Sequence, residues 1–334
     1  MITRRNLARC APSALALAAL GNPARAAGSE AEPVRLGVLK FGTVQWVTDV
    51  IQRHALDAAH GVALRTVILA NNDAGRVALL GGSADVVVSD WLFVASQRAA
   101  GNRLSFAPFT DATGGVMVGR DSPIRSLADL KGRRLGVAGG PIDKSWIIMQ
   151  AAARATGGVD LASAARVDYG APPLLDAKLG QGELDAVLTY WNFAARLEAE
   201  GAREAITVAD CARALGLPAQ LGLVGFVFHE DWARQHRAAI DGFLAAAAEA
   251  EQLLARSDAE WDAVRPLMQA PNDVLFAALK RRFIAGIPHE TAEQEEATAA
   301  RVLDILRHTG GARATANLSS LPEGMFWRVP ADHG

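Results

Sequence analysis

Tryptophan recurs where a predicted strand gives way to a predicted helix. The chain has 7 tryptophans, and those at such junctions are Trp46, Trp91, Trp146 and Trp191. Tryptophan offers a flat apolar face and one N–H donor, which suits contact with an organic ligand. The alternative is that these side chains begin helices and fill the core.

The residues that follow each predicted strand are the candidate ligand contacts. In an open α/β sheet, ligands bind outside the carboxyl ends of the strands. The predicted contacts are Thr43, Gln45, Trp46, Asp90, Trp91, Gly139, Gly140, Lys144, Ser145, Trp146, Tyr190, Trp191 and Asn192. The two halves of the chain each contribute two of the four tryptophans, as a cleft between two lobes requires.

Asp90 and the glycine pair carry the chemical expectations. Asp90 either accepts a hydrogen bond from a ligand N–H, amine or hydroxyl, or only caps the helix beginning at Trp91. Gly139 and Gly140 precede a helix whose free N–H groups would hold an acidic group, although two glycines also form an ordinary turn. Because an unpaired buried carboxylate repels anions, Asp90 argues against simple anions as ligands.

Motifs of common enzymes are missing from the sequence. We find no P-loop, dinucleotide-binding fingerprint, nucleophile elbow or zinc-protease motif. His54 and His60 are six residues apart and fall on different helix faces. Cys10 and Cys211 are too few for a disulfide framework, and Cys211 is expected to be a small buried apolar residue. The sequence therefore predicts a protein that is not an enzyme, with no catalytic residue, metal or cofactor.

The composition is that of a globular protein. Of 334 residues, 50% are hydrophobic and 21% are charged, and the formal net charge is -2. These values argue against extensive disorder and give no basic surface for nucleic acid. No apolar run reaches the roughly 18 residues that a membrane-spanning helix needs.

The first 26 residues are typical of an export signal. Arg4-Arg5 precedes a mildly apolar run at 11–20, and Ala24-Arg25-Ala26 supplies a small-x-small cleavage pattern. The weak hydrophobicity and Arg25 suit the twin-arginine route. We expect cleavage near Ala26 and a periplasmic mature protein, rather than a fortuitously basic N-terminus.

Strand-like and helical patterns alternate through most of the chain. Predicted strands are 34–39, 63–69, 85–89, 104–109, 115–118, 134–138, 166–169, 186–189 and 221–229. Predicted helices are 45–60, 73–80, 91–100, 126–129, 143–155, 172–179 and 191–200, followed by 237–256, 259–268, 273–285 and 290–308. This order predicts an α/β fold with two parallel-rich sheets and a helical C-terminal region.

The chain is expected to cross twice between two lobes. Glycine-bearing segments at 113–115 and 222–225 are the predicted hinges, and the ligand would lie in the cleft between the lobes. The predicted domains are a signal peptide at 1–26, a discontinuous first lobe at 33–114 and 225–310, a second lobe at 115–224, and a tail at 311–334. A monomer that closes around one ligand is expected.

Three stretches carry a family resemblance: 81–87 (GGSADVV), 121–132 (DSPIRSLADLKG) and 179–186 (LGQGELDA). From about 34 to 305 the chain resembles the periplasmic substrate-binding proteins of nitrate/sulfonate/taurine-type ABC importers, which include thiamine-precursor binders. The resemblance implies a type II periplasmic-binding fold that closes on a small organic solute. It also implies delivery to an ABC permease and ATPase at the inner membrane, and ligand loops at the four junctions.

Two other functions stay open. One is an enzyme on the same fold, of the pyrimidine-synthesising or desulfinase-like kind; the export signal and the lack of a His/Cys constellation argue against it. The other is a sensor that binds a solute without feeding a transporter, which the sequence does not distinguish from a transport protein.

Overall fold

The structure is a computed structural model that describes residues 31–40 and 42–329. The predicted export signal and Cys10 lie outside these residues. Strands and helices alternate as predicted, and the fold is α/β with two five-stranded sheets. None of the helices in the described ranges is long and apolar enough to cross a membrane.

The first sheet is built mainly from the N-terminal part of the chain. Its strand order is β2 (Val62–Leu69), β1 (Glu32–Leu39), β3 (Val86–Asp90), β10 (Val224–His229) and β4 (Leu104–Thr110). β1 pairs in parallel with β2 and β3, whereas β10 runs antiparallel to β3 and β4. A strand from late in the chain therefore completes this sheet.

The second sheet repeats this plan. Its order is β7 (Arg166–Gly170), β6 (Arg134–Ala138), β8 (Ala186–Thr189), β5 (Gly115–Val118) and β9 (Arg203–Thr207). β6 pairs in parallel with β7 and β8, and β5 runs antiparallel to β8 and β9. The sequence analysis does not predict β9 or the following helix α9 (Val208–Ala214). β9 is an edge strand that begins with charged residues and is mostly half-buried, so its pattern is weak.

Helices connect the strands of each sheet. Those of the first sheet are α1 (Val44–Arg53), α2 (Leu56–Ala59), α3 (Asn72–Leu80) and α4 (Trp91–Ala99). Those of the second are a 3-10 turn (Leu127–Leu130), α5 (Lys144–Gly157), α6 (Leu161–Ala164), α7 (Pro172–Gly180) and α8 (Trp191–Ala199).

The predicted helix 45–60 is wrong as one element. The chain breaks between α1 and α2 because Ala55 is left-handed, with φ 52°. In α2, the Asp57 carboxylate accepts a hydrogen bond from the Leu64 N–H at 3.1 Å. This bond ties the second short helix to the strand that follows it.

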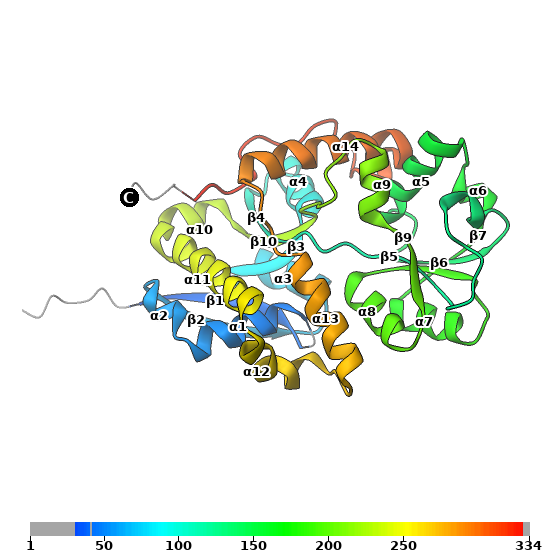
Figure 1. Ribbon diagram of the computed structural model, residues 1–334. Coiled ribbons are helices and arrows are strands. Elements are labelled where there is room, and N and C mark those ends of the chain that lie inside the picture. The colour runs from blue at the N-terminus through cyan, green and yellow to red at the C-terminus, as the bar shows by residue number, and fades with distance from the viewer. Residues whose placement is uncertain (1–30, 41, 330–334) are drawn as a thin grey trace, which may run out of the picture. The chain divides into compact units, whose positions relative to one another are not determined.

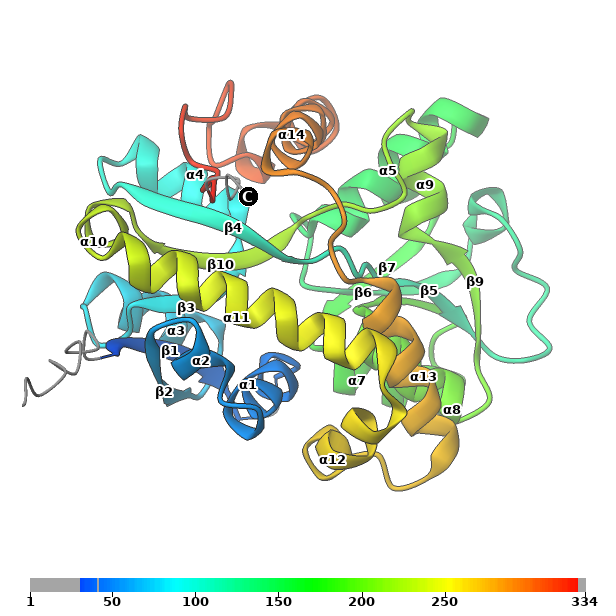
Figure 2. The ribbon, with the colours of Figure 1, turned by 60° about the vertical axis from the view of Figure 1, so that its left-hand side comes forward.

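The helices after β10 contact elements of both sheets (Figures 1 and 2). They are α10 (Glu230–Gln235), α11 (Arg237–Arg256), α12 (Asp258–Met268), α13 (Asp273–Ala285) and α14 (Ala292–Ala314). α11 packs against α1 and the strands β1 and β2, α13 packs against α8, and α14 packs against α5. The domain limits expected from the sequence stay a prediction. α13 and α14, which the sequence analysis assigns to the first lobe, also pack against helices that connect strands of the second sheet.

The chain passes from the first sheet to the second between β4 and β5, and returns between α9 and β10. Gly114 lies in the first of these connections. A Cβ at Gly114 would overlap the backbone carbonyl of Thr189, at the end of β8. Only glycine lets this connection run so close to the second sheet.

Candidate functional site

The carboxyl ends of β3 and β6 bring together two opposite charges. Asp90 is the last residue of β3, and Lys144 begins α5, which follows β6. Lys144 Nζ lies 3.2 Å from Asp90 Oδ1, and the two side chains are 20% and 18% exposed. The ion pair therefore joins a strand end of the first sheet to a helix start of the second.

Asp90 has further partners within its own half of the protein. Its Oδ1 accepts a hydrogen bond from the Phe93 N–H at 3.0 Å, which caps α4. Its Oδ2 accepts another from Arg76 Nη2, on α3, also at 3.0 Å. Burial alone would raise the pKa of Asp90, but Lys144, the Phe93 N–H and Arg76 together hold it below its ordinary value.

These partners correct one argument made from the sequence. Asp90 does cap its helix, and its carboxylate is not unpaired. The objection to anionic ligands, which rests on an uncompensated Asp90 charge, therefore loses its basis. The sequence analysis does not single out Arg76, because α3 carries no motif that would distinguish this arginine from a solvated surface residue.

Lys144 has fewer charged partners than Asp90. In the part of the chain that the structure describes, its one ion pair is with Asp90. When the pair separates, Asp90 keeps Arg76 and the Phe93 N–H, whereas Lys144 keeps only its attraction to Asp143, a carboxyl group whose pKa is raised by burial. A partly buried ammonium with so little compensation is costly, so the group that best replaces Asp90 is an anion.

Gly139, which follows β6, lies close to the side chains of Asp143 and Tyr190. Gly139 and Gly140 have φ of 82° and 91°, a region that favours glycine. A Cβ at Gly139 would lie 2.6 Å from the Tyr190 hydroxyl oxygen and 2.7 Å from Asp143 Oδ2. The glycine therefore makes room for the phenol and the carboxyl group to approach each other.

Asp143 and Tyr190 have perturbed proton affinities. Burial raises the pKa of Asp143, which caps α5 by accepting a hydrogen bond from the Trp146 N–H at 3.1 Å. Burial and the Asp143 charge raise the pKa of Tyr190 to about 12, so its hydroxyl remains a donor at neutral pH. Asp143 therefore already binds one of the free N–H groups at the start of α5, the helix start that the sequence predicts will hold an acidic group of the ligand.

Three of the four junction tryptophans lie in the hydrophobic core. Trp91 and Trp146 are each 1% exposed, and Trp46 is 4% exposed. Trp46 meets Trp191 edge to face, with ring centroids 6.3 Å apart, and also contacts Phe283. Their positions match the core-filling alternative, and protein atoms cover the faces of the three buried rings. Trp191 is partly exposed.

The other predicted contacts are spread around these helix starts. Thr43 precedes α1 without capping it through its side chain, and Gln45 Nε2 donates to the Leu39 carbonyl at 2.9 Å. Ser145 and Asn192 are partly exposed at the starts of α5 and α8. Among the described residues, no hydrogen bond or ion pair joins these four side chains to Asp90 or Lys144.

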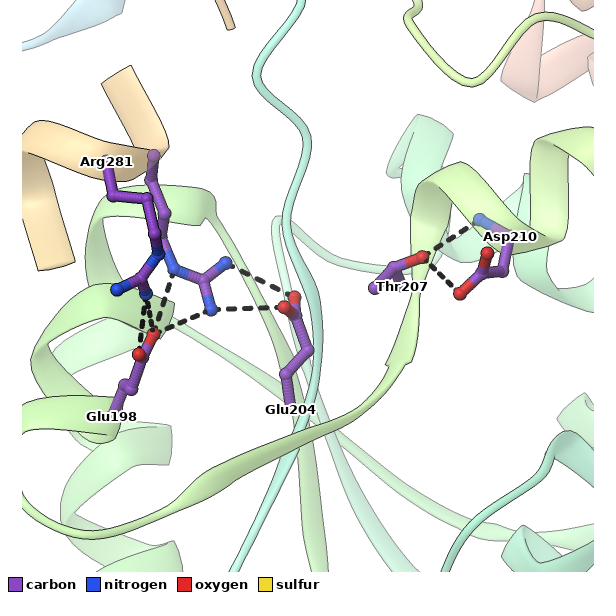
Figure 3. A network of polar contacts seen from close by, with 6 residues as sticks. Glu198, Glu204, Thr207, Asp210 and Arg281 are labelled. Carbon is purple, nitrogen blue, oxygen red and sulfur yellow. Dashed lines mark hydrogen bonds and ion pairs between the residues drawn. The ribbon is translucent and has the colours of Figure 1, made fainter. Parts of the chain in front are cut away.

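A second polar cluster links α13 to the second sheet (Figure 3). Arg282 Nη2 lies 3.1 Å from Glu198 Oε2 on α8 and 3.0 Å from Glu204 Oε2 on β9. Arg281 Nη2 lies 2.6 Å from Glu198 Oε1. These ion pairs fasten the C-terminal helices to the second sheet, beside the contact of Phe283 with Trp191.

The fold is that of two-lobed periplasmic binding proteins. The family model described as "NMT1/THI5 like" matches residues 57–260, which is more than half of the chain. The chain belongs to this family, and the family resemblance inferred from the sequence is confirmed. A search of curated proteins found no match.

Solved structures show the same fold. The aliphatic sulphonate-binding protein SsuA from Escherichia coli is 20% identical with a TM-score of 0.68, covering 85% of this chain and 94% of that chain. SsuA from Xanthomonas axonopodis pv. citri, bound to MOPS, is 19% identical with a TM-score of 0.62, covering 90% and 100%. The desulfurization enzyme DSZB is 16% identical with a TM-score of 0.55, covering 84% and 92%.

Proposed function

We propose that this protein is the solute-binding component of an ABC import system. It binds a small organic molecule where the carboxyl ends of β3 and β6 face each other and delivers it to a membrane permease. The observation that carries this proposal is the Asp90–Lys144 ion pair between the two sheets. The likeness in fold to sulfonate-binding proteins adds support.

The proposed ligand carries an acidic group. Lys144 would take this group in place of Asp90, which retains Arg76 as its own counter-charge. The Tyr190 hydroxyl would donate a further hydrogen bond, and Asp90 would accept one from a donor elsewhere on the ligand. Trp191, the one partly exposed junction tryptophan, would contact an apolar part of the ligand.

We also propose that the protein acts in the periplasm as a monomer, after cleavage of its signal near Ala26. The basis is the tripartite pattern of residues 1–26 together with the family to which the chain belongs. The permease and the ATPase are its proposed partners.

An enzyme is the second candidate, because a desulfurization enzyme shares this fold. Within the described residues the available thiol is Cys211, which is 3% exposed. Burial and Asp210 raise its pKa to about 12, so it is poorly suited to act as a nucleophile. Mass spectrometry of a bound compound would separate the two candidates, since an enzyme would convert the compound and a binding protein would release it unchanged.

Thermal unfolding with a panel of probes tests the proposed function. The panel contains MOPS, taurine, an alkanesulfonate, a neutral pyrimidine and an alkylamine. Compounds with an acidic group are expected to stabilise the protein, by about 2.7 kcal/mol at a hundredfold excess over Kd. Lys144→Gln should abolish this response, whereas Lys178→Gln, which alters an ion-paired lysine of α7, should preserve it. Stabilisation by the amine alone, unchanged in Lys144→Gln, would refute the anion assignment.

A further inference from the structure

Three carboxyl groups lie buried where the chain passes between the two sheets. Asp111 directly follows β4, Glu251 lies on α11, and Glu295 lies in the first turn of α14. Their exposed fractions are 3%, 8% and 4%. Together they connect three parts of the chain that are far apart in sequence.

The same group of residues contacts the connecting segments. The Asp111 N–H donates a hydrogen bond to the Gly286 carbonyl at 2.8 Å, in the segment between α13 and α14. Gly222, in the connection that returns to β10, packs so closely on Glu295 that a Cβ there would overlap the carboxyl group. The carboxyl cluster therefore lies at the junction of all three connections.

Among the described residues, no lysine or arginine neutralises the cluster. In the described part of the chain, neither lysine nor arginine forms an ion pair with these three residues, and no N–H or hydroxyl group donates to the Asp111 side chain. Its side-chain partner is the Glu295 carboxyl group, which can donate to Asp111 only when it is protonated. The nearest charged neighbours are Glu290, which raises the pKa of Asp111 and Glu295, and His289, which lowers that of Asp111. Both neighbours are exposed. For buried acids in this setting, protonation is the remaining way to neutralise the charge.

Proton affinity in the cluster follows from this environment. Burial and the Asp111 charge raise the pKa of Glu251 to about 8 and that of Glu295 to about 8. Burial raises the pKa of Asp111 to about 6, although a protonated Glu295 favours its charged form. At neutral pH the two glutamates therefore carry protons.

A hollow gives protons access to the cluster. Glu251 lines a hollow of about 530 Å³ bounded by α11, the start of α14 and residues 327–329. Glu293 and Arg328 also line it, but their charges pair with each other at 3.3 Å. Solvent protons can reach Glu251 by this route, without passing through the core.

We propose that Asp111, Glu251 and Glu295 form a proton-binding site that fastens the two connections between the sheets to the segment between α13 and α14. With protons bound, the carboxyl groups tolerate their close approach. When the protons leave, two further negative charges join the cluster, and α11, α14 and the segment after β4 repel one another. Among the described residues, the cluster shares no hydrogen bond or ion pair with Asp90 or Lys144, although Val224 pairs with both Asp90 and Thr110, the residue before Asp111.

The sign of the pH dependence follows from the shifted affinities. The folded state holds the glutamate protons up to about pH 8, whereas the ordinary value for a glutamate is 4.5. Between these values the folded state binds more protons than the unfolded chain, so the cluster's contribution to stability falls as pH rises. Each such proton changes the unfolding equilibrium by up to about tenfold per pH unit. Below about pH 4.5 this contribution is fully present, and above about pH 8 it is lost.

Glutamine variants test the site, because glutamine fills the same space without a titrating proton. Urea unfolding of Glu251→Gln and Glu295→Gln would be compared with wild type from pH 5 to 9. Each variant should gain stability relative to wild type as pH rises to about 8, by several-fold to about tenfold in the unfolding equilibrium per pH unit. Asp262→Asn, which removes an exposed carboxylate on α12, should run parallel to wild type. Parallel curves for the cluster variants would refute the proposal.

Infrared spectroscopy of the wild-type protein gives a second test, which holds even if a variant fails to fold. A carbonyl band from protonated glutamate, identified by isotope labelling of glutamate, should be present at pH 7 and vanish above pH 9. Hydrogen exchange at the Asp111 amide, normalised to an unstructured peptide at each pH, should accelerate over the same range. A spectrum with no protonated glutamate at pH 6 would rule the site out.

Discussion

Lys144 Nζ lies 3.2 Å from Asp90 Oδ1, and this contact joins the end of β3 in the first sheet to the start of α5, the helix that follows β6 of the second sheet. The partnership is unequal, because Asp90 also holds Arg76 and the Phe93 N–H, while Lys144 has no second ion pair among the described residues. This inequality determines which group a ligand is expected to replace. It also determines how substitutions on the two sides of the pair should differ.

Substitutions of Asp90 should separate its role as a counter-charge from its role as the cap of α4. Asp90→Asn keeps an acceptor for the Phe93 N–H but leaves Arg76 and Lys144 without their shared counter-charge. We expect a loss of about 1.5–3 kcal/mol in the free energy of unfolding, the usual range for a hydrogen bond to a charged group. Asp90→Ala should cost about 1 kcal/mol more, because the helix cap is lost as well. Urea unfolding at pH 7 measures both values.

Lys144→Gln is the matched comparison for this prediction. It should lower the free energy of unfolding by less than Asp90→Asn does, because Arg76 and the Phe93 N–H would still compensate the Asp90 charge. If Lys144→Gln destabilises the protein more than Asp90→Asn, the assigned inequality between the two residues is wrong.

Gly139 should tolerate no side chain. In Gly139→Ala the new Cβ meets both a left-handed backbone and the Tyr190 hydroxyl at 2.6 Å. Gly182→Ala is the control, because Gly182 has φ 74° but no atom within 4 Å of the new Cβ. We expect the control to lose about 1 kcal/mol from backbone strain alone. Gly139→Ala should lose more, and its Tyr190 should also titrate at a changed pH. Equal losses in thermal unfolding would show that the close approach of Tyr190 does not matter.

The sequence predicts most of the fold because strand and helix patterns are local. Hydrophobic runs such as 86–88 and 186–188 identify buried strands, and most observed limits lie close to the predicted ones, although the helix predicted to end at 308 continues to Ala314. Ala55 breaks a helix without glycine or proline at that position, so no local pattern announces it. The edge strand β9 escapes prediction because its half-buried, charged sequence lacks the hydrophobic run of the other strands.

The candidate site was harder to predict because its properties depend on distant residues. Trp91 and Trp146 stand at strand ends, as expected, but the surrounding core covers their rings. The charge on Asp90 can be judged only once Arg76 and Lys144 are known to reach it. Likewise, Glu251 and Glu295 have the sequence context of ordinary helix surfaces, and only the packing of three connections buries them.

Export by the twin-arginine route is a prediction from residues 1–26 alone. Replacing Arg4 and Arg5 together by lysine keeps the positive charge but removes the residues that this route reads. The precursor should then accumulate in the cytoplasm, whereas replacing Arg9 by lysine should leave maturation unchanged. Cell fractionation and the mass of the mature chain measure the outcome. Normal periplasmic processing of the double variant would point to the general secretory route.

The Arg282 ion pairs should matter more than those of its neighbour. The Arg282 side chain is 14% exposed and joins Glu198 and Glu204, whereas Arg281 is 57% exposed and joins Glu198 alone (Figure 3). Arg282→Ala leaves Glu204 without a cation beside Gly115, against which its carboxyl group packs. We expect this variant to lose about 1.5–3 kcal/mol in the free energy of unfolding. Arg281→Ala should lose less than about 1 kcal/mol, because exposed ion pairs contribute little.

The double variant Arg282→Ala/Glu204→Gln separates the two causes of that loss. Removing the Glu204 charge as well should recover part of the stability, because no unpaired carboxylate then remains beside Gly115. A loss in Arg282→Ala that comes only from packing would be unchanged in the double variant. Urea unfolding of wild type, Arg282→Ala and the double variant measures this difference.

Salt should separate the two arginines. In urea unfolding of Arg282→Ala and Arg281→Ala at low and high salt, the contribution of the partly buried Arg282 pairs should be screened less than that of the Arg281 pair. Equal salt sensitivity of the two single variants would mean that Arg282 does not fasten α13 to the second sheet by its charge.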